Sequence, residues 1–154
     1  MINEEYYRIA HFYQDLYRTS REFSFFHFNL DLSFGPCVKK RLAGCGAGTE
    51  YLALSPEGDL YPCHQFVGKR EFIMGNVLLG MSFDRRLYQR FLEVDINAKE
   101  DCRNCWAKFF CGGGCHANAF NFNDDLLKPY RLGCALEKMR LECALGIQAY
   151  KTCG

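Results

Sequence analysis

The apolar positions near the start of the chain predict a helix followed by a strand. Aromatic and aliphatic residues recur at helical spacing from residue 3 to about 19, with Asn3 as the candidate N-cap. From 26 to 32 apolar and polar residues alternate, which is the period of a half-buried strand. His27 and Asp31 fall on the polar face of this strand. We assign them no chemistry, because no other candidate residues converge on them.

Two short apolar runs around a turn signal predict a β-hairpin. The run YLALS at 51–55 and a second run that ends in Cys63 flank the turn sequence PEGD at 56–59. Upstream, glycine and proline interrupt regular structure, so we expect Cys37 and Cys45 in an irregular loop. The hairpin is expected to hold Cys63 opposite the loop that carries Cys45.

The second half of the chain predicts short elements and one final helix. We expect a short strand at 72–74, a helix at 82–93 with Ser82 as its N-cap, and a short helix in HANAFNF at 116–122. A last helix is expected to open at Cys134. These patterns predict an α+β fold: a small domain with an N-terminal helix, a β-hairpin, several short C-terminal helices and few long regular elements.

Composition and charge narrow the function classes. The chain has 154 residues with 49% hydrophobic residues, which is typical of one modest folded domain. Lys plus Arg number 19 against 18 for Asp plus Glu, so net charge gives no reason to expect nucleic acid or an anionic membrane as partner. The basic run at 39–41 is interpreted as a solvated loop. No apolar run is long enough to span a bilayer, and the start MINEEYY is unlike a secretory signal, so we expect a cytoplasmic protein.

The most closely spaced cysteines lie in the stretch CRNCWAKFFCGGGC, from Cys102 to Cys115. Its four thiols have the spacing C-x2-C-x5-C-x3-C, which indicates an iron–sulfur site. The glycine run 112–114 lets the backbone pass close to a bulky cluster. Zinc is the alternative, although zinc sites usually pair two similar knuckles around one ion.

The remaining cysteines divide by their setting. The chain has ten cysteines, and in a reducing compartment metal ligation is favoured over disulfides. Cys134 is expected at a helix N-terminus, where the helix dipole favours an anionic cluster. Cys143 falls in the apolar stripe of the last helix and is interpreted as a small buried hydrophobe. Cys153 is expected in a frayed C-terminal tail and is left unassigned, and His64 is interpreted as a neighbour of Cys63 and not as a ligand.

The cysteine pattern resembles a known family. Cys45, twelve residues, Gly58, four residues and Cys63, followed by the 102–115 stretch and Cys134, resemble the SPASM domain of radical S-adenosylmethionine enzymes. More narrowly, GPCVKKRLAGCGAGTEYLALSPEGDLYPCHQFVG and CGGGCHANAF resemble maturases of six-cysteine ranthipeptide precursors, which build thioether crosslinks.

The resemblance implies two [4Fe–4S] clusters. It assigns a proximal set of ligands, Cys45, Cys63 and Cys115, and a distal set, Cys102, Cys105, Cys111 and Cys134. The fourth thiol of the dense stretch thus crosses over to the other cluster, as in two-cluster ferredoxins. A domain organised in this way is expected to fold largely because the metal is bound.

The sequence departs from the family in what it lacks. The C-x3-C-x2-C loop that binds the S-adenosylmethionine cluster does not occur in it. We therefore expect residues 1–34 to be a helix and strand left from, or linking to, a missing radical barrel, and residues 35–154 to be the SPASM domain. S-adenosylmethionine would act only through that barrel, supplied in the same or another chain. Whether the chain counts as an enzyme is left open, and alone it should be inactive.

Two function hypotheses remain. In the first, the chain is the auxiliary-cluster domain of an enzyme that crosslinks a Cys-rich precursor peptide, binding the substrate thiolate and accepting electrons. In the second, it is a stand-alone iron–sulfur electron-transfer or peptide-binding protein.

Seven thiols leave one iron of the proximal cluster without an assigned ligand. Cys37, eight residues before Cys45, is the candidate, and some SPASM enzymes close the cluster with such an upstream cysteine. The resemblance to thioether-forming enzymes favours an open position instead, with Cys37 near the cluster but not bound to it.

Overall fold

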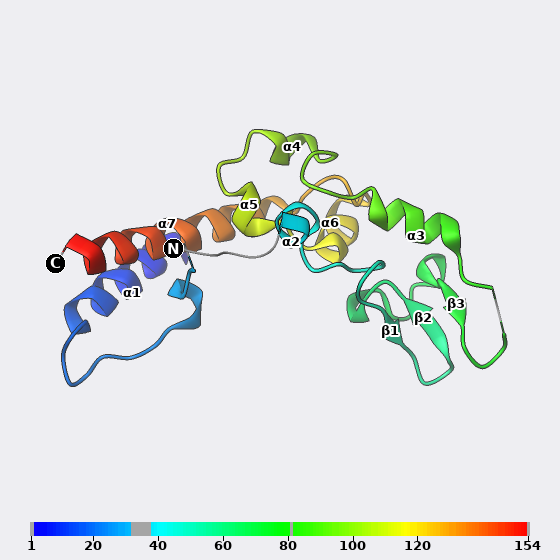
Figure 1. The fold of residues 1–154 in the computed structure, drawn as a ribbon, viewed down its shortest axis with the longest axis horizontal. Coiled ribbons are helices and arrows are strands. Elements are labelled where there is room, and N and C mark those ends of the chain that lie inside the picture. The colour runs from blue at the N-terminus through cyan, green and yellow to red at the C-terminus, as the bar shows by residue number, and fades with distance from the viewer. Residues whose placement is uncertain (1, 32–37, 81, 154) are drawn as a thin grey trace. The chain divides into compact units, whose positions relative to one another are not determined.

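The computed structural model describes residues 2–31, 38–80 and 82–153. They form two compact units: one comprises the described residues of 1–35 and 131–154, and the other those of 36–130 (Figure 1). Helices and a small antiparallel sheet occur together, which confirms the predicted α+β class. Among the described residues, no helix is both long and apolar enough to cross a membrane.

The first unit is built on two long helices, α1 (Ile2–Leu16) and α7 (Arg131–Cys153). They run side by side in the same direction, and Lys151 Nζ donates to Tyr13 Oη at 3.1 Å (Figure 1). The predicted first helix is confirmed, but it already includes Asn3, so the predicted cap at Asn3 is wrong. The buried residues between the helices form one core, made of Ala10, Tyr13, Phe28, Met139, Cys143, Ala144 and Ile147.

The strand predicted at 26–32 is wrong. Phe26–Phe28 form a 3-10 helix, and none of the described strands pairs with this segment. Phe28 is 2% exposed and Phe26 is 74% exposed, although the alternating pattern placed both on the same face. Packing decided the outcome, because the Phe28 ring meets Tyr13 edge to face and a tight turn is needed to bring it there.

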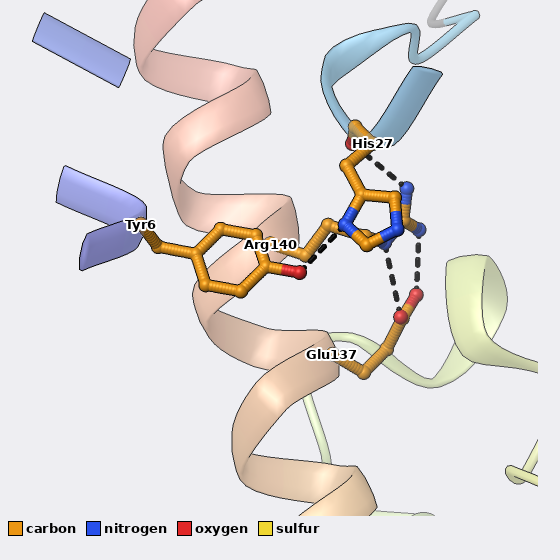
Figure 2. A network of polar contacts seen from close by, with 4 residues as sticks. All are labelled: Tyr6, His27, Glu137 and Arg140. Carbon is orange, nitrogen blue, oxygen red and sulfur yellow. Dashed lines mark hydrogen bonds and ion pairs between the residues drawn. The ribbon is translucent and has the colours of Figure 1, made fainter. Parts of the chain in front are cut away.

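A polar network fastens this segment to both helices (Figure 2). Tyr6 Oη and His27 Nδ1 are hydrogen-bonded at 2.6 Å, and Arg140 donates to the His27 carbonyl oxygen at 3.1 Å. Arg140 also forms two hydrogen bonds to the Glu137 carboxylate, at 2.6 and 3.0 Å. His27 thus contacts α1 through its ring and α7 through its carbonyl oxygen.

The second unit contains a three-stranded antiparallel sheet in the order β1-β2-β3. β1 (Ala53–Leu54) pairs with β2 (Asp59–Tyr61), which confirms the predicted hairpin. β3 (Gly75–Asn76) begins one residue after the predicted strand ends, because Phe72 closes a 3-10 helix, Arg70–Phe72. A further 3-10 helix, His64–Phe66, follows β2.

The helices of the second unit are short. They are α2 (Val38–Ala43), α3 (Arg85–Leu92), α4 (Glu100–Arg103), α5 (Lys108–Cys111) and α6 (His116–Asn123). The basic run at 39–41 is thus helical, and the predicted loop there is wrong. α6 confirms the predicted short helix, with Asn123 as an additional residue.

The predicted boundaries of two helices need correction. The N-cap of α3 is Asp84, whose carboxylate accepts from the backbone N–H groups of Arg86 and Leu87, and not Ser82. α7 begins at Arg131, three residues before Cys134, and extends to Cys153, so the expected frayed tail is helical.

Aromatic rings form the core of the second unit. Phe66, Phe72 and Phe91 pack against one another with ring centroids 4.2–6.1 Å apart. Other buried members are Ala47, Tyr61, Cys63, Met74, Leu87, Val94, Ala117 and Leu126. Cys63 and Ala47 belong to this core, so the backbone near the predicted proximal ligands is fixed by packing.

Candidate metal centre

The proximal set comes from three separate elements of the second unit. Cys45 follows α2, Cys63 follows β2, and Cys115 is the N-cap residue of α6. The Gly48 N–H donates to the Pro62 carbonyl oxygen at 2.8 Å, which places the turn after Cys45 against the end of the hairpin. The expectation that the hairpin holds Cys63 opposite this loop agrees with this contact.

The pKa of the Cys63 thiol responds to the other two thiols of the proximal set. Burial raises its pKa most, and the negative charges of the Cys115 and Cys45 thiolates raise it further. Backbone N–H groups of Gln65 and Phe66 act in the opposite direction by donating to the Cys63 sulfur. Such N–H···S contacts also stabilise thiolates bound to iron, so Cys63 is suited to ligation.

The Cys115 sulfur accepts from two donors. The Asn118 N–H approaches it at 3.5 Å from the first turn of α6, and Gln65 Nε2 approaches it at 3.7 Å. Both donors direct N–H groups at this sulfur, which is the contact that an iron-bound thiolate accepts. Gln65 thereby links the segment after Cys63 to Cys115.

Two glycines allow the ligand-bearing segments to cross. A Cβ atom added to Gly112 would lie 2.7 Å from Gly44 Cα and 2.9 Å from the Lys40 carbonyl oxygen. Gly112 also has φ +65°, a conformation that favours glycine. The chain next to Cys45 therefore touches the chain next to Cys111, at a distance that no side chain would permit.

Two buried basic residues flank this crossing. The Lys99 ammonium group is fully buried and donates to the Gly113 carbonyl oxygen at 2.7 Å. His116 is 3% exposed, and its Nε2 donates to the Ala43 carbonyl oxygen at 3.3 Å. Burial, with a smaller contribution from Lys99, lowers the pKa of His116 to about 4, so its imidazole is neutral at pH 7.

The dense cysteine stretch folds into two one-turn helices. Cys102 is buried in α4, Cys105 lies in the turn after it, and Cys111 ends α5. The Cys105 N–H donates to the Cys102 carbonyl oxygen at 3.1 Å, which gives the C-x2-C pair its turn. Three of the four members of the distal set thus lie within one short segment of the second unit.

The two remaining candidates lie elsewhere. Cys134 lies in the first turn of α7, within the first unit, as expected for a residue near a helix N-terminus. Cys37 lies outside the described residues. Cys143 is buried in the core of the first unit, as predicted for a small hydrophobe.

The donor chemistry of the second unit fits iron–sulfur clusters. Cys45, Cys63, Cys105 and Cys115 are thiols, and sulfur is the ligand atom that such clusters require. Within 2–31, 38–80 and 82–153, no three His, Cys, Asp or Glu side chains are gathered closely enough for a single metal ion. In a cubane each thiolate binds a different iron, so its ligands are spread more widely than those of one ion.

Comparison with known proteins points to the same chemistry. The SPASM family, described as an iron-sulfur cluster-binding domain, matches residues 45–106. This range indicates iron–sulfur binding and includes Cys45, Cys63, Cys102 and Cys105, whereas Cys111, Cys115 and Cys134 lie beyond it.

Two relatives are similar over more than half of the chain. An uncharacterized protein of Archaeoglobus fulgidus is 32% identical over 94 residues, which are 58% of this chain and 22% of that protein. The antilisterial bacteriocin subtilosin biosynthesis protein AlbA of Bacillus subtilis is 31% identical over 99 residues, which are 57% of this chain and 20% of AlbA. The chain spans about a fifth of the length of these curated relatives.

The sequence patterns did not predict four residues that lie near the proximal set. Gln65, Lys99, His116 and Asn118 have no metal-ligand spacing. The partners of Gln65, Lys99 and His116 are 14 to 73 residues away, and Asn118 acts through its backbone N–H, which is independent of its side chain. His116 had one available signal, because it directly follows a candidate ligand.

Proposed function

We propose that this chain is the auxiliary-cluster domain of a radical S-adenosylmethionine enzyme that modifies a peptide. The observation that carries the proposal is that Cys45, Cys63 and Cys115, drawn from three elements, lie on segments joined by hydrogen bonds, from the Gly48 N–H to the Pro62 carbonyl oxygen and from Gln65 to the Cys115 sulfur. Cys45 and Cys63 also fall within the range that matches an iron-sulfur domain. The similarity to a protein named for subtilosin biosynthesis supports a peptide substrate. Cysteine usage supports a cytoplasmic location.

The proposed ligands form two groups. The proximal set holds one [4Fe–4S] cluster and the distal set holds the other, and the assignment of Cys134 to the distal cluster rests on the resemblance to SPASM domains. When bound, the clusters supply electron acceptance and, at one open iron, a position for a substrate thiolate.

The chain's own residues prepare this position. Cys45, Cys63 and Cys115 would hold three irons of the proximal cluster and would leave the fourth for a substrate thiolate. Backbone N–H groups of Gln65 and Phe66 donate to the Cys63 sulfur and favour its thiolate form, and the Asn118 N–H donates to the Cys115 sulfur. Gln65 donates to Cys115 and so keeps that sulfur directed toward the neighbourhood of Cys63.

The finer proposal concerns substrate and partners. We propose thioether crosslink formation in a Cys-rich precursor peptide, with the radical generated by a barrel domain that acts in the same or another chain. Residues 1–34 then connect to, or remain from, that barrel. S-adenosylmethionine binds only to the barrel, because this sequence has no C-x3-C-x2-C loop.

Metal analysis tests the proposal. Anaerobic reconstitution of the chain with iron and sulfide should give about eight irons and eight sulfides per chain, since each of two cubanes has four of each. Two zinc ions per chain, or one cluster only, would contradict it.

The open position has its own test. The Cys37→Ala variant should keep both clusters, and a Cys-containing peptide should change the spectrum of the proximal cluster, whereas the same peptide with Ser in place of Cys should not. Loss of the proximal cluster in Cys37→Ala, or no response to the thiol peptide, would favour a closed cluster that relays electrons.

A further inference from the structure

One hydrogen bond joins two ligand-bearing segments that are far apart in the sequence. The His116 ring lies directly after Cys115, and Ala43 lies two residues before Cys45. Nε2 of His116 and the carbonyl oxygen of Ala43 are 3.3 Å apart, across a sequence separation of 73 residues. The bond therefore fixes the approach to Cys45 relative to the residue that follows Cys115.

The partner determines which ring nitrogen carries the proton. A carbonyl oxygen only accepts, so Nε2 must be the N–H of the neutral imidazole. Nδ1 is then an acceptor, and within the described structure it has no hydrogen-bond partner although it is buried. Burial of an unpaired acceptor is unfavourable, and an apolar side chain would fill the same space beside the Phe91 ring without that cost. Packing alone thus gives a poor explanation for histidine here.

The glycine contact at this crossing gives proximity without direction, because a van der Waals contact between Gly44 and Gly112 permits sliding. Two further hydrogen bonds, from the Ile96 N–H to the Leu42 carbonyl oxygen at 3.0 Å and from Lys99 to the Gly113 carbonyl oxygen at 2.7 Å, hold each segment to the stretch at 96–99. The His116 bond adds a directional constraint that joins the two segments to each other, because both N–H and carbonyl must be aligned.

A second histidine provides an internal comparison. His64 directly follows Cys63, another member of the proximal set, but its side chain is exposed and its ring contacts Tyr51 Oη at 3.2 Å. The His64 bond thus joins two exposed side chains at the surface, whereas His116 is buried and its ring is bonded to a backbone carbonyl oxygen.

We propose that His116 is a positioning residue of the proximal site, which holds the Cys45 and Cys115 segments in register for cluster binding through its Nε2–H bond to Ala43. The inference rests on the proposed function, because it presupposes that these cysteines bind a cluster. His116 itself does not ligate iron in this proposal.

Substitutions of His116 and of the control residue His64 in the 154-residue chain test the positioning role. The amide nitrogen of Gln occupies about the place of Nε2, and that of Asn about the place of Nδ1. After anaerobic reconstitution with iron and sulfide, His116→Gln should keep about eight irons, whereas His116→Asn and His116→Phe should fall to about four. Their residual spectrum in the reduced state should match that of Cys63→Ala. His64→Gln, the matched control, should bind iron like the unsubstituted chain.

The outcomes distinguish failure of the proposed cluster-binding function from failure of the positioning role of His116. If the unsubstituted chain binds no cluster, the proposed function fails. If it binds two clusters and His116→Phe or His116→Asn also binds two, His116 has no positioning role. If His116→Gln loses iron as His116→Asn does, or if all three His116 variants lose both clusters, the Nε2–H bond is not the cause and the inference is overturned.

Discussion

Buried cysteines in this protein differ in what surrounds them. Cys63 and Cys143 both have a pKa raised first of all by burial. Around Cys63, two further thiols and two backbone N–H groups create a setting for metal ligation. Cys143 instead lies among Met139, Ala144 and Ile147 in an apolar core. The residue type is the same, and on the basis of these neighbours we propose Cys63 as a ligand and Cys143 as a small buried hydrophobe.

We predict that Cys143→Ala leaves iron content unchanged. The substitution removes one small buried sulfur, so the free energy of unfolding should fall by only about 1 kcal/mol. Iron analysis after reconstitution and chemical denaturation followed by circular dichroism measure the two effects. A drop of iron to about four per chain would instead make Cys143 a ligand.

The raised pKa of Cys143 also predicts that folding stability depends on pH. Above the thiol's ordinary pKa of about 8.5, the unfolded chain loses this proton while the folded chain retains it, so folding stability declines as pH rises. The decline in melting temperature from about pH 7.5 to about pH 9.5 should therefore be smaller in Cys143→Ala than in the unsubstituted chain. If the melting temperatures of both proteins fall equally over this pH range under anaerobic conditions, the Cys143 thiol does not contribute to the pH dependence of stability.

At the scale of elements, helix ends were the least predictable feature. Ser82 and Asp84 are both suitable N-cap residues, and only the structure shows that Asp84 accepts from two N–H groups of α3. The backbone selects between them, because the Asp84 N–H donates to the Met74 carbonyl oxygen at 2.6 Å, beside β3. α3 therefore starts where the sheet anchors the chain.

We predict that Asp84→Ala lowers the free energy of unfolding by about 1 kcal/mol, as loss of a helix cap does. Ser82→Ala is the matched control and should change it by less than about 0.5 kcal/mol, as surface substitutions do. Chemical denaturation of both variants measures the difference, and equal effects would contradict the assignment of the cap.

The glycine crossing gives a second prediction at this scale. Gly112 and Gly114 both have positive φ, but a Cβ atom on Gly114 would meet nothing within 4 Å. Gly114→Ala should therefore cost about 1–2 kcal/mol for backbone strain alone. Gly112→Ala should cost about 1–3 kcal/mol more, because the added atom overlaps backbone atoms of Gly44 and Lys40.

Stability and iron content of these two variants are measured together. Gly112→Ala should also bind less iron than Gly114→Ala. Both glycines adjoin a candidate ligand, but only a Cβ atom at Gly112 would push apart the segments that carry Cys45 and Cys111. If Gly114→Ala proves as damaging as Gly112→Ala, the close crossing is not what the glycine provides.

At the scale of the whole molecule, regular structure is sparse in the second unit. Its sheet has strands of two or three residues, and two of its helices have four residues. Such elements contribute little stability on their own. We therefore expect metal binding to supply much of the folding free energy.

We predict that Cys111→Ala or Cys134→Ala removes the distal cluster and much of the cooperative fold together. Iron should fall to about four per chain, and the melting transition should broaden and shift to lower temperature. Cys153→Ala is the control, because it removes an exposed thiol at the end of α7. A sharp, undiminished melting transition in Cys111→Ala would show that folding does not depend on the cluster.

The sequence by itself determined the features that depend on neighbours along the chain. The period of apolar residues predicted α1, helix start and stop signals predicted α6, and two apolar runs around PEGD predicted the hairpin, because helices and turns depend on local spacing. Cysteine spacing likewise predicted the iron–sulfur chemistry, since a C-x2-C pair forms one turn.

Tertiary structure decided what depends on residues that are distant in the sequence. It turned the aromatic segment at 26–28 into a 3-10 helix, because Phe28 packs on α1 and no described strand pairs with that segment. It also brought His116 to Ala43 and Gly112 to Gly44, contacts for which no spacing rule exists. The ligand types could be derived from the sequence, but the contacts that hold their segments together could not.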